Sequence, residues 1–149
     1  METFLPIAFS CVIAYLVGAI PTGYWCGRLV KGIDIREHGS KNMGATNVFR
    51  VLGKGPGIIV LIIDICKGII PIMVIANGFG FKDPLLLVLA GVIAVAGHNW
   101  TVFLGFKGGK GVATTLGVLF GLTMQVPGIR PVLFLVVGIN HSRNKTFIL

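Results

Sequence analysis

The stretch TFLPIAFSCVIAYLVGAIPTGYWCG, which runs from Thr3 to Gly27, carries no charged side chain. A segment of about 20 predominantly apolar residues is long enough to cross a lipid bilayer as an α-helix. Pro6 and Pro21 lie inside the stretch, and proline bends or shortens a helix because it lacks a backbone N–H. The first part of the chain is therefore predicted to span a membrane as an interrupted helix.

Three further apolar runs follow, at residues 55–81, 84–106 and 111–129. Asp64 and Lys67 interrupt the first of them. Residues 132–139 are also apolar, but they are too few to span a bilayer. We therefore predict an all-α fold, a polytopic membrane helix bundle with about four spans.

The composition excludes an ordinary soluble domain. Of the 149 residues, 54% are hydrophobic and 12% are charged, whereas soluble domains carry about 25% charged residues. The net charge of +8 has a simple explanation in a membrane protein, because basic residues between spans set topology and meet anionic headgroups. We therefore expect the lipid bilayer as a partner, and no nucleic acid. Cys11, Cys26 and Cys66 lie in apolar runs without metal-ligand spacing, so no metal and no cofactor are expected.

The basic residues also predict the orientation in the membrane. The segment between the first two apolar runs contains Arg28, Lys31, Arg36, Lys41, Arg50 and Lys54. The turn before the last run contains Lys107 and Lys110, whereas the middle turn contains only Lys82 and Asp83. The positive-inside rule therefore places the two basic loops in the cytoplasm and the N-terminus outside.

The first candidate site is the polar loop EHGSKNMGATNVFR, residues 37–50. Its glycines allow backbone N–H groups to turn toward an anion. Ser40, Asn42, Thr46 and Asn47 offer neutral hydrogen bonds, and Arg50 offers a planar fork that suits phosphate. An ordinary polar loop uses the same turn residues, so composition leaves that alternative open.

The second candidate site is FKGGKGVATT, residues 106–115, which directly precedes the last apolar run. Free N–H groups at a helix N-terminus, together with glycines and lysines, favour an anion. The stretch is not a Walker A loop, because Leu104 and Gly111 stand where glycine and Ser/Thr are needed. A basic topology anchor explains the lysines but not three glycines, so we favour phosphate binding.

The apolar runs contain a few polar residues that need an explanation. Asp64 and Lys67 are three apart and share a helix face, where they form either a mutual ion pair or a functional site. His98 has either a structural role or a role in positioning or proton transfer. Glycine pairs at GxxxG spacing, Gly23/Gly27 and Gly117/Gly121, predict close helix packing.

In order and spacing, these motifs resemble the bacterial glycerol-3-phosphate acyltransferases that use acyl phosphate, the PlsY family. The matching stretches are residues 18–23 (GAIPTG), 39–42 (GSKN), 44–47 (GATN) with Arg50, 64–68 (DICKG), 98–100 (HNW) and 106–114 (FKGGKGVAT). Several separate motifs in the correct order are far more specific than any one of them.

The resemblance implies an enzyme that transfers a fatty acyl group from acyl phosphate to the 1-hydroxyl of glycerol 3-phosphate. It implies that Ser40 and Asn42 line the reaction centre as catalytic residues. Thr46, Asn47, Arg50 and Lys110 would bind substrate, with Arg50 and Lys110 holding phosphate groups. Gly108, Gly109 and Gly111 would form the phosphate-binding loop. The resemblance also implies a multi-pass protein of the bacterial inner membrane and a partner that supplies acyl phosphate.

The chain departs from the family pattern in two places. Lys41 stands where glycine is common. The motif-based resemblance ends near residue 122, whereas family members continue with further spans and a third motif that includes His-x-x-Asn. His141 and Asn144 have that spacing. We therefore expect an incomplete acyltransferase domain at 1–122 and an atypical tail at 123–149, as in a truncated or frame-shifted member.

Two other functions fit part of the sequence. A small membrane transporter would use Asp64 and Lys67 as an intramembrane site, but transport also needs a polar path, and the spans contain few other polar residues. An inactive helical remnant would only pack through its glycine faces. Acyl transfer is favoured because it alone accounts for both polar loops.

Overall fold

The computed structural model describes residues 4–126 and residue 128, and this part of the chain is helical without any strand. The α-helices are α1 (Phe4–Ala19), α2 (Thr22–Lys31), α3 (Ala45–Leu52), α4 (Lys54–Met73), α5 (Pro84–Asn99) and α6 (Val112–Gln125). Short 3-10 turns lie at η1 (Ile35–Glu37) and η3 (Val102–Leu104), and a π-helical turn, η2 (Val74–Gly78), extends α4. The predicted all-α membrane fold is confirmed.

Three helical segments are long and apolar enough to cross a membrane: Leu5–Lys31, Lys54–Gly78 and Pro84–Leu104. The fourth predicted span appears as α6, which is apolar but has only 14 residues. At 1.5 Å per residue α6 is about 21 Å long, whereas the hydrocarbon core is about 30 Å thick. The described structure therefore contains three full-length candidate spans and one shorter apolar helix.

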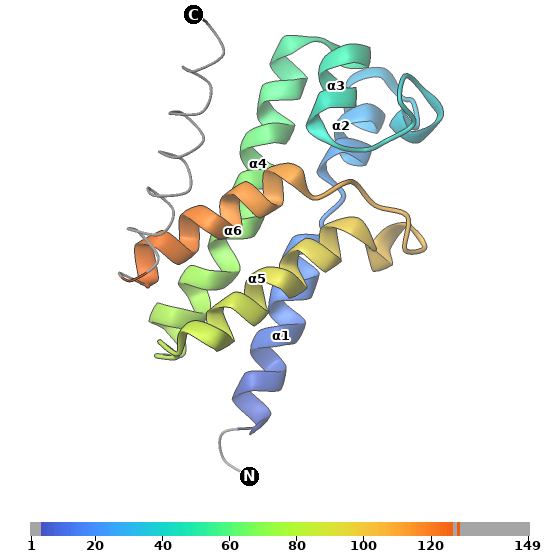
Figure 1. The fold of residues 1–149 in the computed structure, drawn as a ribbon. Coiled ribbons are helices and arrows are strands. Elements are labelled where there is room, and N and C mark those ends of the chain that lie inside the picture. The colour runs from blue at the N-terminus through green and yellow to red at the C-terminus, as the bar shows by residue number, and fades with distance from the viewer. Residues whose placement is uncertain (1–3, 127, 129–149) are drawn as a thin grey trace, which may run out of the picture.

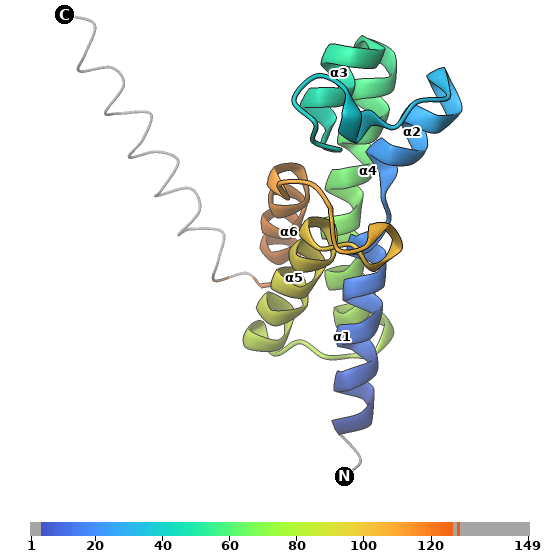
Figure 2. The same ribbon diagram turned by 90° about the vertical axis from the view of Figure 1, so that its right-hand side faces the viewer.

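The helices form a bundle with two ends of different character. Figures 1 and 2 show α1 beside α5 and α6 against α4, with α2 and α3 at the end opposite the N-terminus. The loop that follows α5 lies between these two parts of the molecule (Figure 1). Both polar stretches predicted from the sequence are thus brought to the same side of the bundle.

Glycines allow the helices to approach closely. A methyl group on Gly117 would overlap the backbone carbonyl of Ile65 in α4, and one on Gly97 would overlap the carbonyl of Tyr15 in α1. Gly23 likewise lies against the carbonyl of Met43. The close helix packing predicted from the GxxxG pairs is confirmed for Gly117/Gly121, which packs on α4, whereas Gly23 and Gly27 pack against the segment between α2 and α3.

The chain breaks between α1 and α2 at Ile20 and Pro21, as the position of the proline predicts. Such a break frees backbone carbonyls, which need partners inside a membrane. The hydroxyl of Thr101 donates to the Ala19 carbonyl at 2.5 Å, and the Lys67 ammonium donates to the Ile20 carbonyl at 2.7 Å. Side chains from two other elements therefore stabilise the break.

Large apolar side chains on the outside of the bundle are suited to lipid. Leu5, Phe9, Val12 and Leu16 form an exposed stripe along α1, at the three- and four-residue spacing of one helix face. The boundary at 122/123 between the acyltransferase domain and an atypical tail stays a prediction. His141 and Asn144 lie outside the described residues.

Candidate active site

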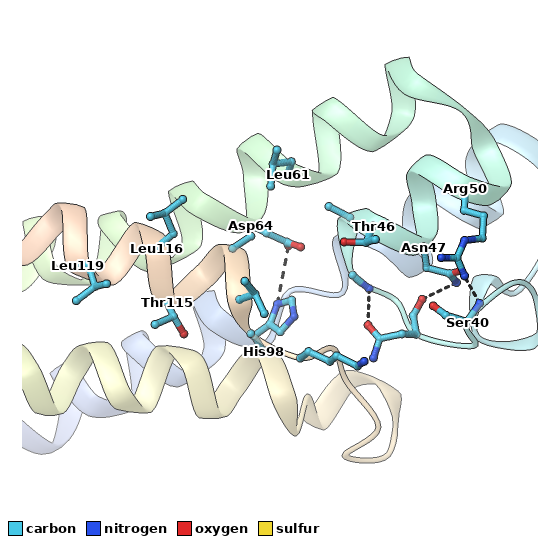
Figure 3. Close-up of a pocket in the computed structure, with 17 residues that line it drawn as sticks. Ser40, Thr46, Asn47, Arg50, Leu61, Asp64, His98, Thr115, Leu116 and Leu119 are labelled. Carbon is cyan, nitrogen blue, oxygen red and sulfur yellow. Dashed lines mark hydrogen bonds and ion pairs between the residues drawn. The ribbon is translucent and has the colours of Figure 1, made fainter. Parts of the chain in front are cut away.

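A pocket of about 580 Å³ opens where the polar loop, α4, the end of α5 and the start of α6 meet (Figure 3). Its lining includes the predicted residues Ser40, Asn42, Thr46, Asn47, Arg50, His98, Lys110 and Gly111. The remaining lining residues are Gly44, Ala45, Leu61, Asp64, Val112, Ala113, Thr115, Leu116 and Leu119. The structure therefore joins both polar stretches with the buried Asp64 and His98 in one cavity.

Asn47 holds the polar loop in shape. Its side-chain oxygen accepts from the Ser40 N–H at 2.8 Å, and its amide nitrogen lies 2.7–3.1 Å from three carbonyl oxygens. Those carbonyls belong to Ile35, His38 and Asn42. The side chain is 2% exposed, so its hydrogen-bonding capacity is used within the protein.

Ser40 and Thr46 are exposed residues of the pocket wall, and no hydrogen bond of either hydroxyl occurs within the described part of the chain. Asn42 is half-buried, and its side-chain oxygen accepts from the Gly44 N–H at 2.9 Å. These groups are therefore positioned by the loop backbone while Ser40 and Thr46 still face the cavity.

Two cations line the pocket, and neither has an acidic partner in the described part of the chain. Neither Arg50 nor Lys110 forms an ion pair with any described residue. Arg50 projects from α3, one turn after Thr46, and Lys110 comes from the loop before α6. Unpaired cations that converge on a cavity attract anions, and a guanidinium can bind a phosphate through two parallel hydrogen bonds.

The glycine-rich loop is fixed to the end of α5. The Gly108 N–H donates to the Asn99 carbonyl and the Gly109 N–H donates to the His98 carbonyl, each at 3.0 Å. Side chains at either glycine would overlap His98 or Asn99. Gly108 and Gly109 are therefore absent from the pocket lining, whereas Gly111, with φ of +70°, lines it and caps α6.

Asp64, Lys67, Thr22 and His98 form a buried polar cluster beside the pocket. The Lys67 ammonium lies 2.8 Å from the Asp64 carboxylate and 3.3 Å from Nδ1 of His98. The Thr22 hydroxyl donates to Asp64. All four side chains are at least 93% buried, and the mutual ion pair predicted from the sequence is confirmed.

Asp64, for which the sequence left an ion pair or a functional site open, reaches the cavity. Sequence reasoning missed several other lining residues. Leu116 and Leu119 of α6 form an apolar end of the pocket, away from Ser40 and Arg50, whereas Leu61 of α4 lies nearer the polar loop, between Asp64 and Thr46 (Figure 3). No motif marks these leucines, because their place in the pocket depends on how α4, α6 and the polar loop pack together.

The polar loop is supported on its other side by an ion pair. Arg36 Nη2 lies 2.7 Å from the Asp34 carboxylate, which also accepts from the Arg36 backbone N–H. The side-chain hydrogen bond from Arg36 holds the pKa of Asp34 below its ordinary value. Among the described residues, no group of three or more His, Cys, Asp or Glu side chains is arranged to hold a metal ion.

Residues 8–144 match the family model described as glycerol-3-phosphate acyltransferase. The chain belongs to the glycerol-3-phosphate acyltransferase family. This match extends past residue 122, where the resemblance read from the motifs ends, and it includes part of the chain outside the described structure.

Individual relatives agree with this family. The glycerol-3-phosphate acyltransferase of Fusobacterium nucleatum is 47% identical over 136 residues, which cover 89% of this chain and 68% of the relative. Glycerol-3-phosphate acyltransferase 2 of Moorella thermoacetica is 48% identical over 76% of this chain and 57% of its own length.

The fold matches a solved member of the glycerol-3-phosphate acyltransferase family. PlsY, an integral membrane glycerol 3-phosphate acyltransferase crystallised in a glycerol 3-phosphate form, is 45% identical, with a TM-score of 0.72. The match covers 89% of this chain and 64% of PlsY. A lysophosphatidic acid form of PlsY matches with a TM-score of 0.70. The chain thus spans roughly two thirds or less of the length of these relatives.

Proposed function

We propose that this protein transfers a fatty acyl group from acyl phosphate to the 1-hydroxyl of glycerol 3-phosphate. The observation that supports this most strongly is the amphipathic pocket, which is lined by Arg50 and Lys110, neither of them paired with an acid among the described residues, and by leucines. Both substrates carry phosphate, and one carries an acyl chain. A cavity with both kinds of lining suits a molecule with an anionic head and an apolar tail.

The relatives support the same substrates. PlsY has been crystallised with glycerol 3-phosphate and with lysophosphatidic acid, which correspond to the proposed acceptor and product. The choice of acyl phosphate as donor rests on the motif resemblance to the PlsY family. It is chemically reasonable because acyl phosphate is already activated, so no covalent enzyme intermediate is required.

The proposed reaction is a direct transfer. The 1-hydroxyl oxygen of glycerol 3-phosphate attacks the acyl carbon and forms the new ester C–O bond, while the bond from that carbon to the phosphate oxygen breaks. A substrate phosphate accepts the hydroxyl proton, and lysophosphatidate and inorganic phosphate leave. The protein then contributes positioning and charge stabilisation rather than a base.

The pocket suggests how the residues divide this work. Ser40 and Asn42 lie at the reaction centre as catalytic residues, and Thr46 adds a hydroxyl for the substrate. Arg50 and Lys110 hold phosphate groups. Gly111 lines the phosphate-binding turn. Gly108, Gly109 and Asn47 support the two loops without contacting substrate, because their hydrogen-bonding groups are engaged within the protein.

The proposed setting is the inner membrane of a bacterium. The basic loops face the cytoplasm and the N-terminus lies outside, as the positive-inside rule predicts. Glycerol 3-phosphate then reaches the pocket from the cytoplasm, while the apolar end opens toward lipid. A partner that makes acyl phosphate supplies the donor.

An acyl-transfer assay on the purified full chain in lipid tests the proposal. The chain receives labelled glycerol 3-phosphate with acyl phosphate, or with acyl-CoA as the competing donor. We expect lysophosphatidate from acyl phosphate, and loss of product in the Ser40→Ala variant. Arg50→Gln and Lys110→Gln should raise the KM for the phosphate-bearing substrates.

Matched controls separate acyl transfer from the alternatives. Lys54→Gln removes an exposed cation outside the pocket and should leave the rate unchanged. Absence of lysophosphatidate from a folded chain would favour an inactive helical remnant. Substrate accumulation in vesicles without product would favour a transporter. Full activity after substitution of Gly111 by alanine would count against transfer assisted by a bound substrate phosphate.

A further inference from the structure

His98 occupies the middle of the pocket, between its two ends. Figure 3 places its ring near Asp64, between the loop that carries Ser40 and the apolar end at Leu116. The residue is 2% exposed, yet it belongs to the pocket lining. Its two ring nitrogens therefore have different surroundings, one inside the buried cluster and one toward the cavity.

The inner nitrogen, Nδ1, lies 3.3 Å from the Lys67 ammonium and 3.9 Å from the Asp64 carboxylate. The longer distance is outside hydrogen-bond range. An ammonium group can only donate, so Nδ1 must accept from Lys67, and the proton of a neutral imidazole then resides on Nε2. Lys67 thereby selects one tautomer of His98.

Lys67 is well placed to enforce this choice. Its ammonium also donates to the Ile20 carbonyl at 2.7 Å and pairs with Asp64 at 2.8 Å. These two contacts fix the position of the ammonium from opposite elements, α4 and the break after α1. The remaining N–H is directed toward Nδ1 of His98 at 3.3 Å and the Thr22 hydroxyl at 3.4 Å, so its direction is determined by buried groups rather than by solvent.

The outer nitrogen, Nε2, lies next to Gly109, where a side chain would overlap it. It forms no hydrogen bond with any described residue. Among those residues, the fully enclosed side-chain N and O atoms that have no hydrogen-bond partner are Asn99 Oδ1 and Thr114 Oγ1. Nε2 is not one of them, so it is not fully enclosed. The absence of a side chain at Gly109 thus leaves the Nε2 edge of the ring uncovered.

We propose that His98 acts as a hydrogen-bond donor through Nε2–H to a phosphate oxygen of a bound substrate, in the tautomer that Lys67 sets. It joins Arg50 and Lys110 in binding phosphate and does not serve as the base. This assignment rests on the proposed function for the identity of the ligand. The donor geometry itself is independent of acyl transfer.

Nuclear magnetic resonance of the full chain in lipid, labelled with ¹⁵N-histidine, tests the tautomer directly. The His98 signals are assigned by their loss in His98→Gln. We expect a protonated Nε2 and an unprotonated Nδ1. A protonated Nδ1, as in a ring that donates to Asp64, overturns the proposal. This measurement needs no enzymatic activity.

The same sample tests contact with phosphate. Inorganic phosphate, glycerol 3-phosphate and a non-transferable acyl phosphonate are titrated separately. We expect saturable movement of the Nε2 signal with at least one probe, and the probe effective at the lowest concentration identifies the phosphate that His98 contacts. His38, whose Nδ1 lies 3.0 Å from the Asp34 carbonyl outside the pocket lining, is the internal control. No movement of His98 with any probe overturns the proposal.

Two substitutions separate a donor from a structural residue. The amide nitrogen of His98→Gln can reach the place of Nε2, whereas His98→Asn offers a polar group only near Nδ1. We expect the KM for glycerol 3-phosphate to be roughly ten- to a hundredfold higher in His98→Asn than in His98→Gln. A purely structural role predicts the reverse order, because only asparagine keeps an acceptor for Lys67, and that order overturns the proposal.

Discussion

Lys67 donates a hydrogen bond of 2.7 Å to the carbonyl oxygen of Ile20, at the point where α1 ends and α2 has not begun. The same ammonium pairs with Asp64. One buried lysine therefore stabilises both an interrupted membrane helix and a carboxylate in the pocket wall. Breaking this contact should be costly, because a buried charge and a free carbonyl would be left behind.

We predict that Lys67→Met lowers the free energy of unfolding by about 3–5 kcal/mol, the cost of leaving a buried charge without its partner. Chemical denaturation in detergent or lipid measures the change. Lys54→Met, which removes an exposed lysine at the start of the same helix, is the control and should alter stability little. Asp64→Leu combined with Lys67→Met should recover part of the loss, and no recovery would contradict this explanation.

Asn47→Ala should destabilise the polar loop. The substitution removes the partner of the Ser40 N–H and of the carbonyls of Ile35, His38 and Asn42. Each unsatisfied buried group costs about 1–3 kcal/mol, so we expect a loss of at least about 2 kcal/mol. Faster hydrogen exchange at the Ser40 amide should accompany it.

Thr46→Ala is the matched control for this loop. Thr46 is the neighbouring residue of α3, it is exposed, and its hydroxyl has no partner in the described part of the chain. Its removal should change stability by less than about 0.5 kcal/mol. Equal destabilisation by both substitutions would mean that the Asn47 hydrogen bonds do not organise the loop.

The membrane fold could be predicted because lipid imposes a simple rule on the sequence. An apolar run must become a helix, since its backbone groups find partners nowhere else, and the runs 55–81 and 84–106 accordingly contain α4 and α5. The break at Pro21 followed from the missing N–H. The predicted run 111–129 also places the start of α6 correctly, but it does not show that the helix ends at Gln125, where the backbone of Val126 becomes extended.

The candidate site was predictable as a set of residues but not as a geometry. Ser40, Arg50 and Lys110 carry recognisable chemistry, and they converge in one pocket. That Gly111 lines the pocket and Gly108 does not was not predictable, because the Gly108 N–H donates to the Asn99 carbonyl in a contact that only the folded structure shows. Hydrogen-bond partners distant in sequence decide which polar groups are free for a ligand.

Gly117→Ala should disrupt the packing of α6 on α4. The added methyl group would meet the carbonyl of Ile65, a backbone atom that cannot move aside as a flexible side chain can. Overpacking of this kind costs about 1–3 kcal/mol, and thermal unfolding in detergent measures it. Gly55→Ala is the control, because nothing lies near its Cβ position in α4. It should be neutral or slightly stabilising, since alanine favours a helix over glycine.

The ion pair between Asp34 and Arg36 should make stability depend on pH. The side-chain hydrogen bond from Arg36 keeps the pKa of Asp34 in the folded protein below the ordinary value of 3.8. A lowered pKa means that the carboxylate favours the folded state. Its contribution is complete above the unfolded pKa and is lost as pH falls through the folded pKa.

Arg36→Gln should raise the Asp34 pKa toward 3.8 and weaken this loss of stability in acid. Carboxyl resonances of labelled Asp34 measure the pKa, and unfolding at pH values from neutral down to below that pKa measures its effect. Arg28→Gln, at an exposed position two turns before η1, is the control. An Asp34 pKa that responds equally to both arginines would contradict a role for the direct hydrogen bond.

Lys41 adopts a backbone conformation that favours glycine. Its φ is +57°, in the left-handed region. A side chain in the left-handed region costs about 1–2 kcal/mol, partly offset by the greater chain entropy that glycine loses on folding. We therefore predict that Lys41→Gly raises the free energy of unfolding by about 0.5–1 kcal/mol, measured by denaturation in lipid.

Lys41→Ala separates backbone strain from charge. Alanine removes the ammonium as glycine does, but it keeps the Cβ that makes a positive φ unfavourable. If strain is the cause, Lys41→Ala should leave stability close to that of the unchanged chain while Lys41→Gly increases it. Equal gains in both variants would instead assign the effect to repulsion between Lys41 and Lys107, which line the same shallow polar pocket. In that case Lys107→Ala should produce the same gain.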